Sequence, residues 1–235
     1  ISAKVSPGDI KNILPKSVPE HGETYSKILG DMQKTIVPGL TLWQHPGFYG
    51  YFAANSSPPA ILADLLSTGL GVQGMLWATG PSVTELEIHV LDLIIDLCGL
   101  PKKFRSTGTG GGVIQDSASS ATLCAVIAAR KRAGGNKVIK RLRAYISTQA
   151  HSSVEKDLLI VGLVPNQIRK VKTNSDQSMS TQDLEELINE DLSLGLIPFF
   201  VVGTVGTTSS GAIDDVKTIS HIASKADAWV HVDAA

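Results

Sequence analysis

The chain has 235 residues, of which 21 are Lys or Arg and 22 are Asp or Glu, so its formal net charge is −1. This balance gives no electrostatic case for nucleic acid or an anionic membrane surface as a partner, and no apolar run approaches the roughly 20 residues needed to span a bilayer. The hydrophobic fraction of 43% and the charged fraction of 18% are typical of a globular protein.

Residues 1–60 are predicted to form an N-terminal arm rather than a domain. Seven prolines break this stretch into short pieces, and one helical pattern fits between them, at residues 24–36. Segment 42–52 is rich in aromatic residues, which suits either simple packing or the wall of a substrate pocket. Because such an arm cannot build its own core, we expect it to pack on the main domain or on a partner subunit.

From about residue 81 the chain alternates helices with short apolar strands. Helices are expected at 82–97, 119–133, 154–161, 180–194 and 214–225, and strands at 143–147, 168–172, 197–204 and 229–232. Ser82 and Ser180 are the expected N-caps of the first and fourth of these helices. The alternation predicts one α/β domain over residues 61–235, with a largely parallel sheet and right-handed crossovers.

The two cysteines, Cys98 and Cys124, both fall in helical patterns among aliphatic residues. We therefore expect buried small side chains rather than a disulfide or a nucleophile. Unpaired thiols fit a reducing, cytoplasmic setting.

A glycine-rich turn at 107–114 leads into hydroxyl residues at a helix start, 117–120. Glycines let backbone N–H groups approach an anion, and a helix N-terminus adds oriented donors, so the segment suits a phosphate. It is neither a Walker loop, since no Gly-Lys-Ser/Thr follows, nor a good dinucleotide fingerprint, since no strand leads into it. The alternative is a flexible connector before a capped helix.

Three polar groups follow predicted strands, and they should therefore meet at one edge of the sheet, where ligands of open α/β proteins bind. His151 follows the first strand, the segment 203–211 ends the third, and Asp233 ends the last. A buried Asp is costly unless it meets a cation. One such cation is a protonated pyridine nitrogen, the partner that an Asp provides for a pyridoxal cofactor.

These motifs resemble the pyridoxal-phosphate-dependent aromatic L-amino acid decarboxylases, the group II decarboxylases. The resemblance rests on the order and spacing of segments 111–115, 117–119, 149–155, 197–200, 206–209 and 231–235, with Trp43, 45–46 and 84–87 near the front. It implies the aspartate-aminotransferase-like fold (fold type I), with a mostly parallel seven-stranded-type sheet flanked by helices. It also implies a homodimer whose arm wraps the partner and whose active site lies at the subunit interface.

The resemblance implies pyridoxal 5′-phosphate as the cofactor, and no metal. Ser117, Ala118 and Ser119 would hold its phosphate at the helix start. His151 would stack over the ring, and Asp233 would pair with the ring nitrogen; these two would be the catalytic residues.

Further positions match family contacts around the ring and the substrate. Thr208 would lie near the ring, and Ala235 would pack against it. Trp43, Tyr51 and Phe52 would line the side chain of an aromatic amino acid substrate.

The chain departs from the family pattern in three ways. The family's lysine that binds the cofactor covalently, in an Asn/His-Lys-Trp motif, is not among these residues, so we expect a fragment of a longer enzyme. Asp116 and Ser120 stand where the family usually has Gly and Glu, and Asp116 either points to solvent or weakens cofactor binding. Ala54 replaces a Pro-Thr pair of the animal relatives, one residue of which contacts bound ligand.

Other readings come from different classes of protein. A glutamate or histidine decarboxylase, or an aromatic aldehyde synthase, would share this fold. A truncated relative could bind cofactor or dimerise without catalysis. A nucleotide-binding α/β domain is disfavoured because neither phosphate-loop fingerprint is present.

Overall fold

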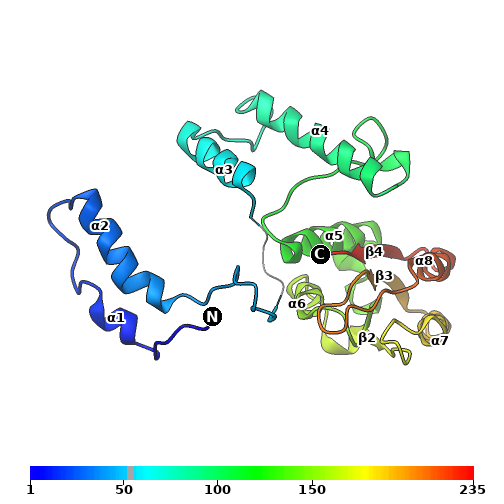
Figure 1. Cartoon of the computed structure of the whole chain (residues 1–235). Helices are drawn as coiled ribbons and strands as arrows, with labels where there is room; N and C mark the ends of the chain where they lie inside the picture. The colour runs from blue at the N-terminus through cyan, green and yellow to red at the C-terminus, as the bar shows by residue number, and fades with distance from the viewer. Residues whose placement is uncertain (52–55) are drawn as a thin grey trace. The chain divides into compact units, whose positions relative to one another are not determined.

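A computed structural model describes residues 1–51 and 56–235, and its contacts divide the chain into two compact units, Ile1–Val72 and Gln73–Ala235 (Figure 1). The arm was expected to end at residue 60. The division lies further along the chain because helix α3, Pro58–Leu70, runs through that position.

Unit 1 consists of short helical segments. They are α1 (Asp9–Ile13), α2 (Tyr25–Asp31) continued by η1 (Met32–Ile36) and η2 (Val37–Gly39), and α3. The helix predicted at 24–36 is confirmed, with Thr24 as its N-cap and η1 as a π-helical last part. The sequence reading missed α3 because Pro58 and Pro59 were taken as breaks. At the start of a helix proline is favourable, and the hydroxyl of Ser57 caps α3 by accepting from the N–H of Ala60.

Unit 2 begins with α4 (Pro81–Leu97), which confirms the helix expected at 82–97. The expected cap, Ser82, is wrong: the N-cap is Gly80, which leaves Pro81 at the first helical position, where its missing N–H costs nothing. Short 3-10 turns follow at Lys102–Phe104, Gly135–Lys137, Ile139–Arg141 and Pro165–Gln167.

The sheet of unit 2 is entirely parallel, as expected. Its strands are β1 (Leu142–Ser147), β2 (Ile168–Val171), β3 (Ile197–Thr204) and β4 (Trp229–Asp233), in the order β2-β1-β3-β4. The described residues therefore form four strands, where the family resemblance implied a sheet of the seven-stranded type. Helices lie between the strands in sequence, so every crossover is an α-helical one.

Helices cover both faces of this sheet (Figure 1). Alternate strand residues pack against α5 (Ala118–Arg132) and α6 (Ser152–Ile160) on one face, and against α7 (Thr181–Ser193) and α8 (Val216–Lys225) on the other. In β3, Phe200 and Val202 face α5 and α6, whereas Val201 faces α7 and α8. This two-sided cover explains why β3 is a continuous apolar run.

The expected burial of the two cysteines is wrong, and the last strand is less buried than the others. Strand β4 is only half-buried, because it has a neighbour on one side alone in the described sheet, and Val232 is exposed. Cys98 and Cys124 are free but exposed, since each lies on a helical surface that no described residue covers. None of the helices in the described part of the chain could span a bilayer.

Candidate active site

The N-terminus of α5 is a well-formed capping box. The Ser117 hydroxyl accepts from the N–H of Ser120 at 3.2 Å, and the Ser120 hydroxyl accepts from the N–H of Ser117 at 3.1 Å. The first helical hydrogen bond runs from the N–H of Ala121 to the carbonyl of Ser117. The N–H groups of Ala118 and Ser119 precede it and point out of the helix end, where they can bind an anion.

Asp116 contacts this helix start. The residue is exposed, and its carboxylate accepts a hydrogen bond from the Ser120 hydroxyl, so it faces solvent while lying at the cap. A carboxylate here already uses part of the positive end of the helix dipole. A phosphate bound to Ala118 and Ser119 would therefore have a negative neighbour.

The glycine-rich segment is packed along α4. A Cβ on Gly108 or Gly110 would lie within 2.8 Å of the Lys103 carbonyl oxygen, so only glycine fits there. The N–H of Gly110 donates to that same carbonyl, and the N–H of Ile114 donates to Glu87 of α4. These glycines thus serve close packing, and the free donors for an anion lie at the helix start.

One side-chain hydrogen bond joins α5 to β4. Thr122 Oγ1 lies 3.2 Å from Nε2 of His231. Because side chains two apart on a strand point to the same face, Asp233 also faces α5. Arg132 at the C-terminal end of α5 contacts Asp227 and Trp229 at the start of β4, so α5 runs antiparallel to β4 and its N-terminus lies at the edge where Asp233 ends the strand. The predicted phosphate and ring-nitrogen partners are therefore brought to one edge and one face.

The environment of His231 is apolar. Its ring stacks on Phe200, with centroids 5.6 Å apart and an interplanar angle of 21°. Burial lowers the pKa of His231, although the neighbouring Asp233 acts to raise it. The imidazole is therefore neutral at pH 7.

Thr204 belongs to the polar segment 203–211 that the sequence places at this edge, although the sequence predicted no role for the residue itself. It ends β3, pairs in register with Asp233, and lies on the same face as Val202. Its side chain is buried, and Oγ1 has no hydrogen-bond partner in the described chain. Asp214 fixes the strand end by accepting from the N–H of Thr204 at 2.7 Å. A buried, unpaired hydroxyl beside a carboxylate is suited to a polar ligand group. A polar residue closing an apolar strand was the available signal.

His151 lies after β1 and is the N-cap of α6, on the face that α5 also covers. Its Nδ1 lies 2.8 Å from the Ser153 hydroxyl and accepts from the N–H of Ser153 at 3.3 Å. The ring is exposed and is held by its own helix, so it can present a face to a ligand at the carboxyl edge.

The loop after β3 places Thr208 at an exposed turn, whereas Thr207 is buried and ties the loop together. The Thr207 hydroxyl lies 2.6 Å from that of Ser210 and accepts from the N–H of Ala212 at 3.1 Å. Ala235 is exposed, and its N–H donates to Asp233 Oδ1 at 3.3 Å.

The predicted substrate residues lie in unit 1. Trp43 stacks on Tyr51 with centroids 5.4 Å apart, and on Phe48 at 5.1 Å. Phe52 and Ala54 lie outside the described residues. The aromatic segment thus forms a local cluster.

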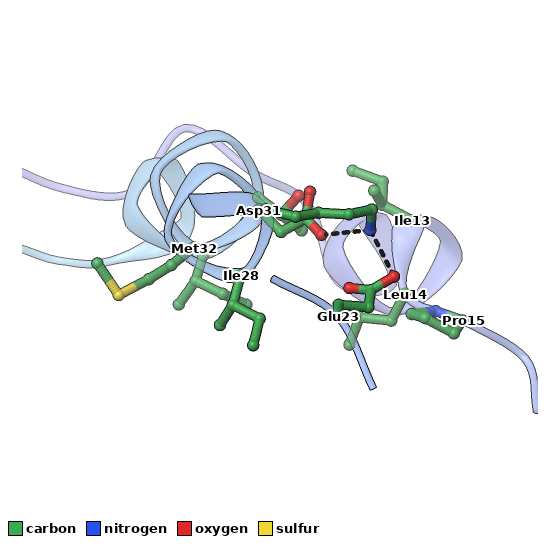
Figure 2. Close-up of a pocket in the computed structure, with 10 residues that line it drawn as sticks. Ile13, Leu14, Pro15, Glu23, Ile28, Asp31 and Met32 are labelled. Carbon is green, nitrogen blue, oxygen red and sulfur yellow. Dashed lines mark hydrogen bonds and ion pairs between the residues drawn. The ribbon is translucent and has the colours of Figure 1, made fainter. Parts of the chain in front are cut away.

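Unit 1 also holds a cavity of about 520 Å³ between α1 and α2 (Figure 2). Ile28 and Met32 line it, and Lys27 bridges Glu23 and Asp31 at its rim, at 2.7 and 3.1 Å. None of the predicted site residues lines this cavity.

Comparison with known protein families identifies the family to which this chain belongs. The model of the pyridoxal-dependent decarboxylase conserved domain matches residues 7–235. The chain belongs to this pyridoxal-dependent decarboxylase family.

Relatives within the pyridoxal-dependent decarboxylase family include both decarboxylases and aldehyde synthases. Tyrosine decarboxylase 2 of Arabidopsis thaliana is 44% identical, with 100% of this chain and 44% of the relative covered. Phenylacetaldehyde synthase of the same plant is 43% identical, with 100% and 49% covered. The crystal structure of Catharanthus roseus tryptophan decarboxylase in complex with L-tryptophan superposes with a TM-score of 0.96 at 40% identity, over 99% of this chain and 51% of that one. The chain spans about half the length of these relatives.

The residues at the carboxyl edge fit the pyridoxal phosphate of this decarboxylase family. The free N–H groups of the α5 start suit its phosphate, and Asp233 suits a protonated ring nitrogen. The buried hydroxyl of Thr204, which is in register with Asp233 and has no partner in the described chain, could bind a polar group of the cofactor. The fold is accordingly that of the aspartate-aminotransferase-like decarboxylases.

Proposed function

We propose that this chain is the cofactor-binding part of an enzyme that decarboxylates an aromatic L-amino acid to the amine and CO2. The observation that carries the proposal is the placement of the α5 start and Asp233 at one edge and on one face, joined through Thr122 and His231. The similarity to tyrosine and tryptophan decarboxylases supports the aromatic substrate class, of the tyrosine, DOPA, tryptophan or 5-hydroxytryptophan type.

Each residue at the edge has a separate task in this proposal. Ala118 and Ser119 bind the phosphate, with Ser117 holding the helix start in shape. His151 stacks on the ring, and Asp233 keeps a proton on the ring nitrogen. The cofactor, when bound, withdraws electrons from the bond to the departing carboxylate, and the protonated nitrogen strengthens that withdrawal.

The remaining positions have roles toward the cofactor ring and the substrate in the same proposal. Thr208 and Ala235 flank the ring, while Trp43, Tyr51 and Phe52 line the substrate's aromatic side chain. The stacking of Trp43 and Tyr51 supports an aromatic wall of this kind. Such a wall excludes water and favours a planar apolar group.

An aromatic aldehyde synthase is the second candidate. Phenylacetaldehyde synthase and tyrosine decarboxylase 2 of Arabidopsis thaliana are about equally similar to the chain. The products separate the two: chromatography of a reaction with tyrosine, tryptophan or phenylalanine gives the amine in one case and the aldehyde in the other.

Assembly and location belong to the same proposal. A homodimer would cover the apolar side chains that unit 1 leaves exposed, among them Ile28, Leu29 and Met32. Two free thiols fit the cytoplasm. Light scattering and cell fractionation test these two statements independently.

Intact mass tests the cofactor proposal directly. The full-length protein is incubated with pyridoxal phosphate, reduced with borohydride and weighed. One reduced adduct per chain supports a working decarboxylase. No specific adduct would mean that the pocket is not a covalent cofactor site, as in a truncated relative that only dimerises or binds.

A further inference from the structure

We propose that Thr122 and His231 are positioning residues, which set the distance between the phosphate donors and the ring-nitrogen carboxylate. The inference rests on the proposed function, because it takes the α5 start and Asp233 as the two ends of the cofactor site. Its basis is the 3.2 Å contact between Thr122 Oγ1 and His231 Nε2, which joins residues 109 apart in sequence.

The pair is held rigidly on both sides. Thr122 is 4% exposed, and no other hydrogen bond to its hydroxyl is seen in the described chain. The His231 ring is fixed by stacking on Phe200. Breaking this bond would leave the buried Thr122 hydroxyl and the half-buried His231 ring nitrogen without partners, and an unpaired buried polar group costs more than the net strength of the bond.

The contact between Thr122 and His231 lies about 6–7 Å from each end of the site, on the side away from the carboxyl edge. Ala118 is four residues before Thr122, about 6 Å up the helix and on the same side. Asp233 is two residues after His231, about 6.6 Å along the strand and on the same face. Ala118 and Asp233 both lie on the carboxyl-edge side of the contact, so the bond fixes the separation of the two ends. The phosphate and the ring nitrogen of a rigid cofactor are a fixed distance apart. Its binding is therefore sensitive to an error of a fraction of an ångström in the separation of the two ends of the site.

The protonation state of His231 serves the same end. Burial lowers its pKa, so the ring is neutral and leaves the charge of Asp233 to the cofactor. A cationic His231 on the same face would compete for that carboxylate.

The test compares a ligand that contacts both ends of the site with a ligand that contacts only the Asp233 end. Dissociation constants for pyridoxal phosphate and for pyridoxal, which lacks the phosphate, are measured on the full-length protein by fluorescence titration. The substitution Thr122→Val keeps the shape of the side chain and removes its hydroxyl. We expect it to raise the dissociation constant of pyridoxal phosphate about tenfold. The same substitution should raise the dissociation constant of pyridoxal less than about twofold, because pyridoxal does not contact both ends of the site.

Controls separate positioning from folding. Thr122→Ser restores the hydroxyl and should restore pyridoxal phosphate binding, while His231→Phe keeps the stacking and should behave like Thr122→Val. Equal weakening of both ligands, or failure of Thr122→Ser to restore binding, would overturn the inference. If the wild type binds pyridoxal phosphate and Thr122→Val binds it equally well, this inference alone fails. If the wild type binds none, the proposed function fails with it.

Discussion

The two units of this chain differ in how their apolar side chains are used. Unit 1 has no buried residue among those described, although Ile28, Leu29 and Met32 share one side of α2 and η1. In unit 2, two clusters of buried residues sandwich the sheet, and Leu158 and Val201 are fully buried. The same residue types thus form a core only where a sheet provides a second surface to pack against. The exposed apolar side chains of unit 1 are typical of a surface that packs against another protein surface.

Hydrogen exchange should show the largest difference between the units. Amides of β1 and β3 open only with global unfolding and should be protected by several orders of magnitude. Amides of α2 should exchange at rates close to those of an unfolded peptide in the monomer, and slow down on dimerisation. Protection of α2 in a protein shown by light scattering to be monomeric would break the comparison.

The polar core of unit 2 should be its most sensitive point. Asp191 is 1% exposed, accepts from the Tyr145 hydroxyl at 2.7 Å, and lies 3.2 Å from Nε of Arg169. Burial and the adjacent carboxylate raise the pKa of Tyr145, so the phenol stays protonated as the donor. Asp191→Ala should lower the free energy of unfolding by about 3 kcal/mol, since it leaves the buried Tyr145 hydroxyl without an acceptor and removes one of the two carboxylates that Arg169 contacts. Glu190→Ala, which removes an exposed partner of Arg169, is the matched control in urea unfolding and should cost less than about 1 kcal/mol.

A matched pair of leucines compares the units directly. Leu158→Ala in α6 removes a fully buried side chain and should cost about 3 kcal/mol. Leu29→Ala in α2, where the side chain is 53% exposed, should change the free energy of unfolding by less than about 0.5 kcal/mol. Similar costs for the two would show that unit 1 is packed as tightly as unit 2.

The smallest expected effect is pH-dependent. Asp157 of α6 is 4% exposed, one carboxylate oxygen has no partner in the described chain, and burial raises the pKa of this carboxyl. Its folded pKa therefore exceeds the unfolded value, the native state binds the extra proton, and stability falls as pH rises from the unfolded to the folded pKa. Asp157→Asn should therefore be more stable than the wild type by about 1 kcal/mol at pH 7 and lose this advantage near pH 4, as urea unfolding at several pH values will show. An advantage that does not change with pH would assign the effect to packing.

Local patterns were enough to predict most elements of unit 2. The strands and their flanking helices follow from apolar periodicity and from caps such as Ser180, whose hydroxyl accepts from the N–H of Asp183. Exposure was not predictable in the same way, because the burial of Cys98 and of β4 depends on which elements lie beside them.

For the candidate site, the sequence identified polar groups at strand ends but not the contacts that order them. The bond between Thr122 and His231 joins positions too far apart for any local pattern. Thr204 looked like the last residue of an apolar run, and its significance appears only when β3 and β4 are in register. The family resemblance supplied the roles of His151 and Thr208, which chemistry at a strand end leaves open.

Within the described part of the chain β4 pairs on one side only, and this has a consequence for handling the protein. A strand with one partner presents a row of unsatisfied backbone donors and acceptors, and Val232 adds an exposed apolar side chain beside them. When these 235 residues are produced by themselves, two copies can pair through that side. Thioflavin binding and turbidity should then grow with concentration, and Val232→Lys should suppress both. The strand that carries Asp233 therefore also determines the solubility of the isolated residues.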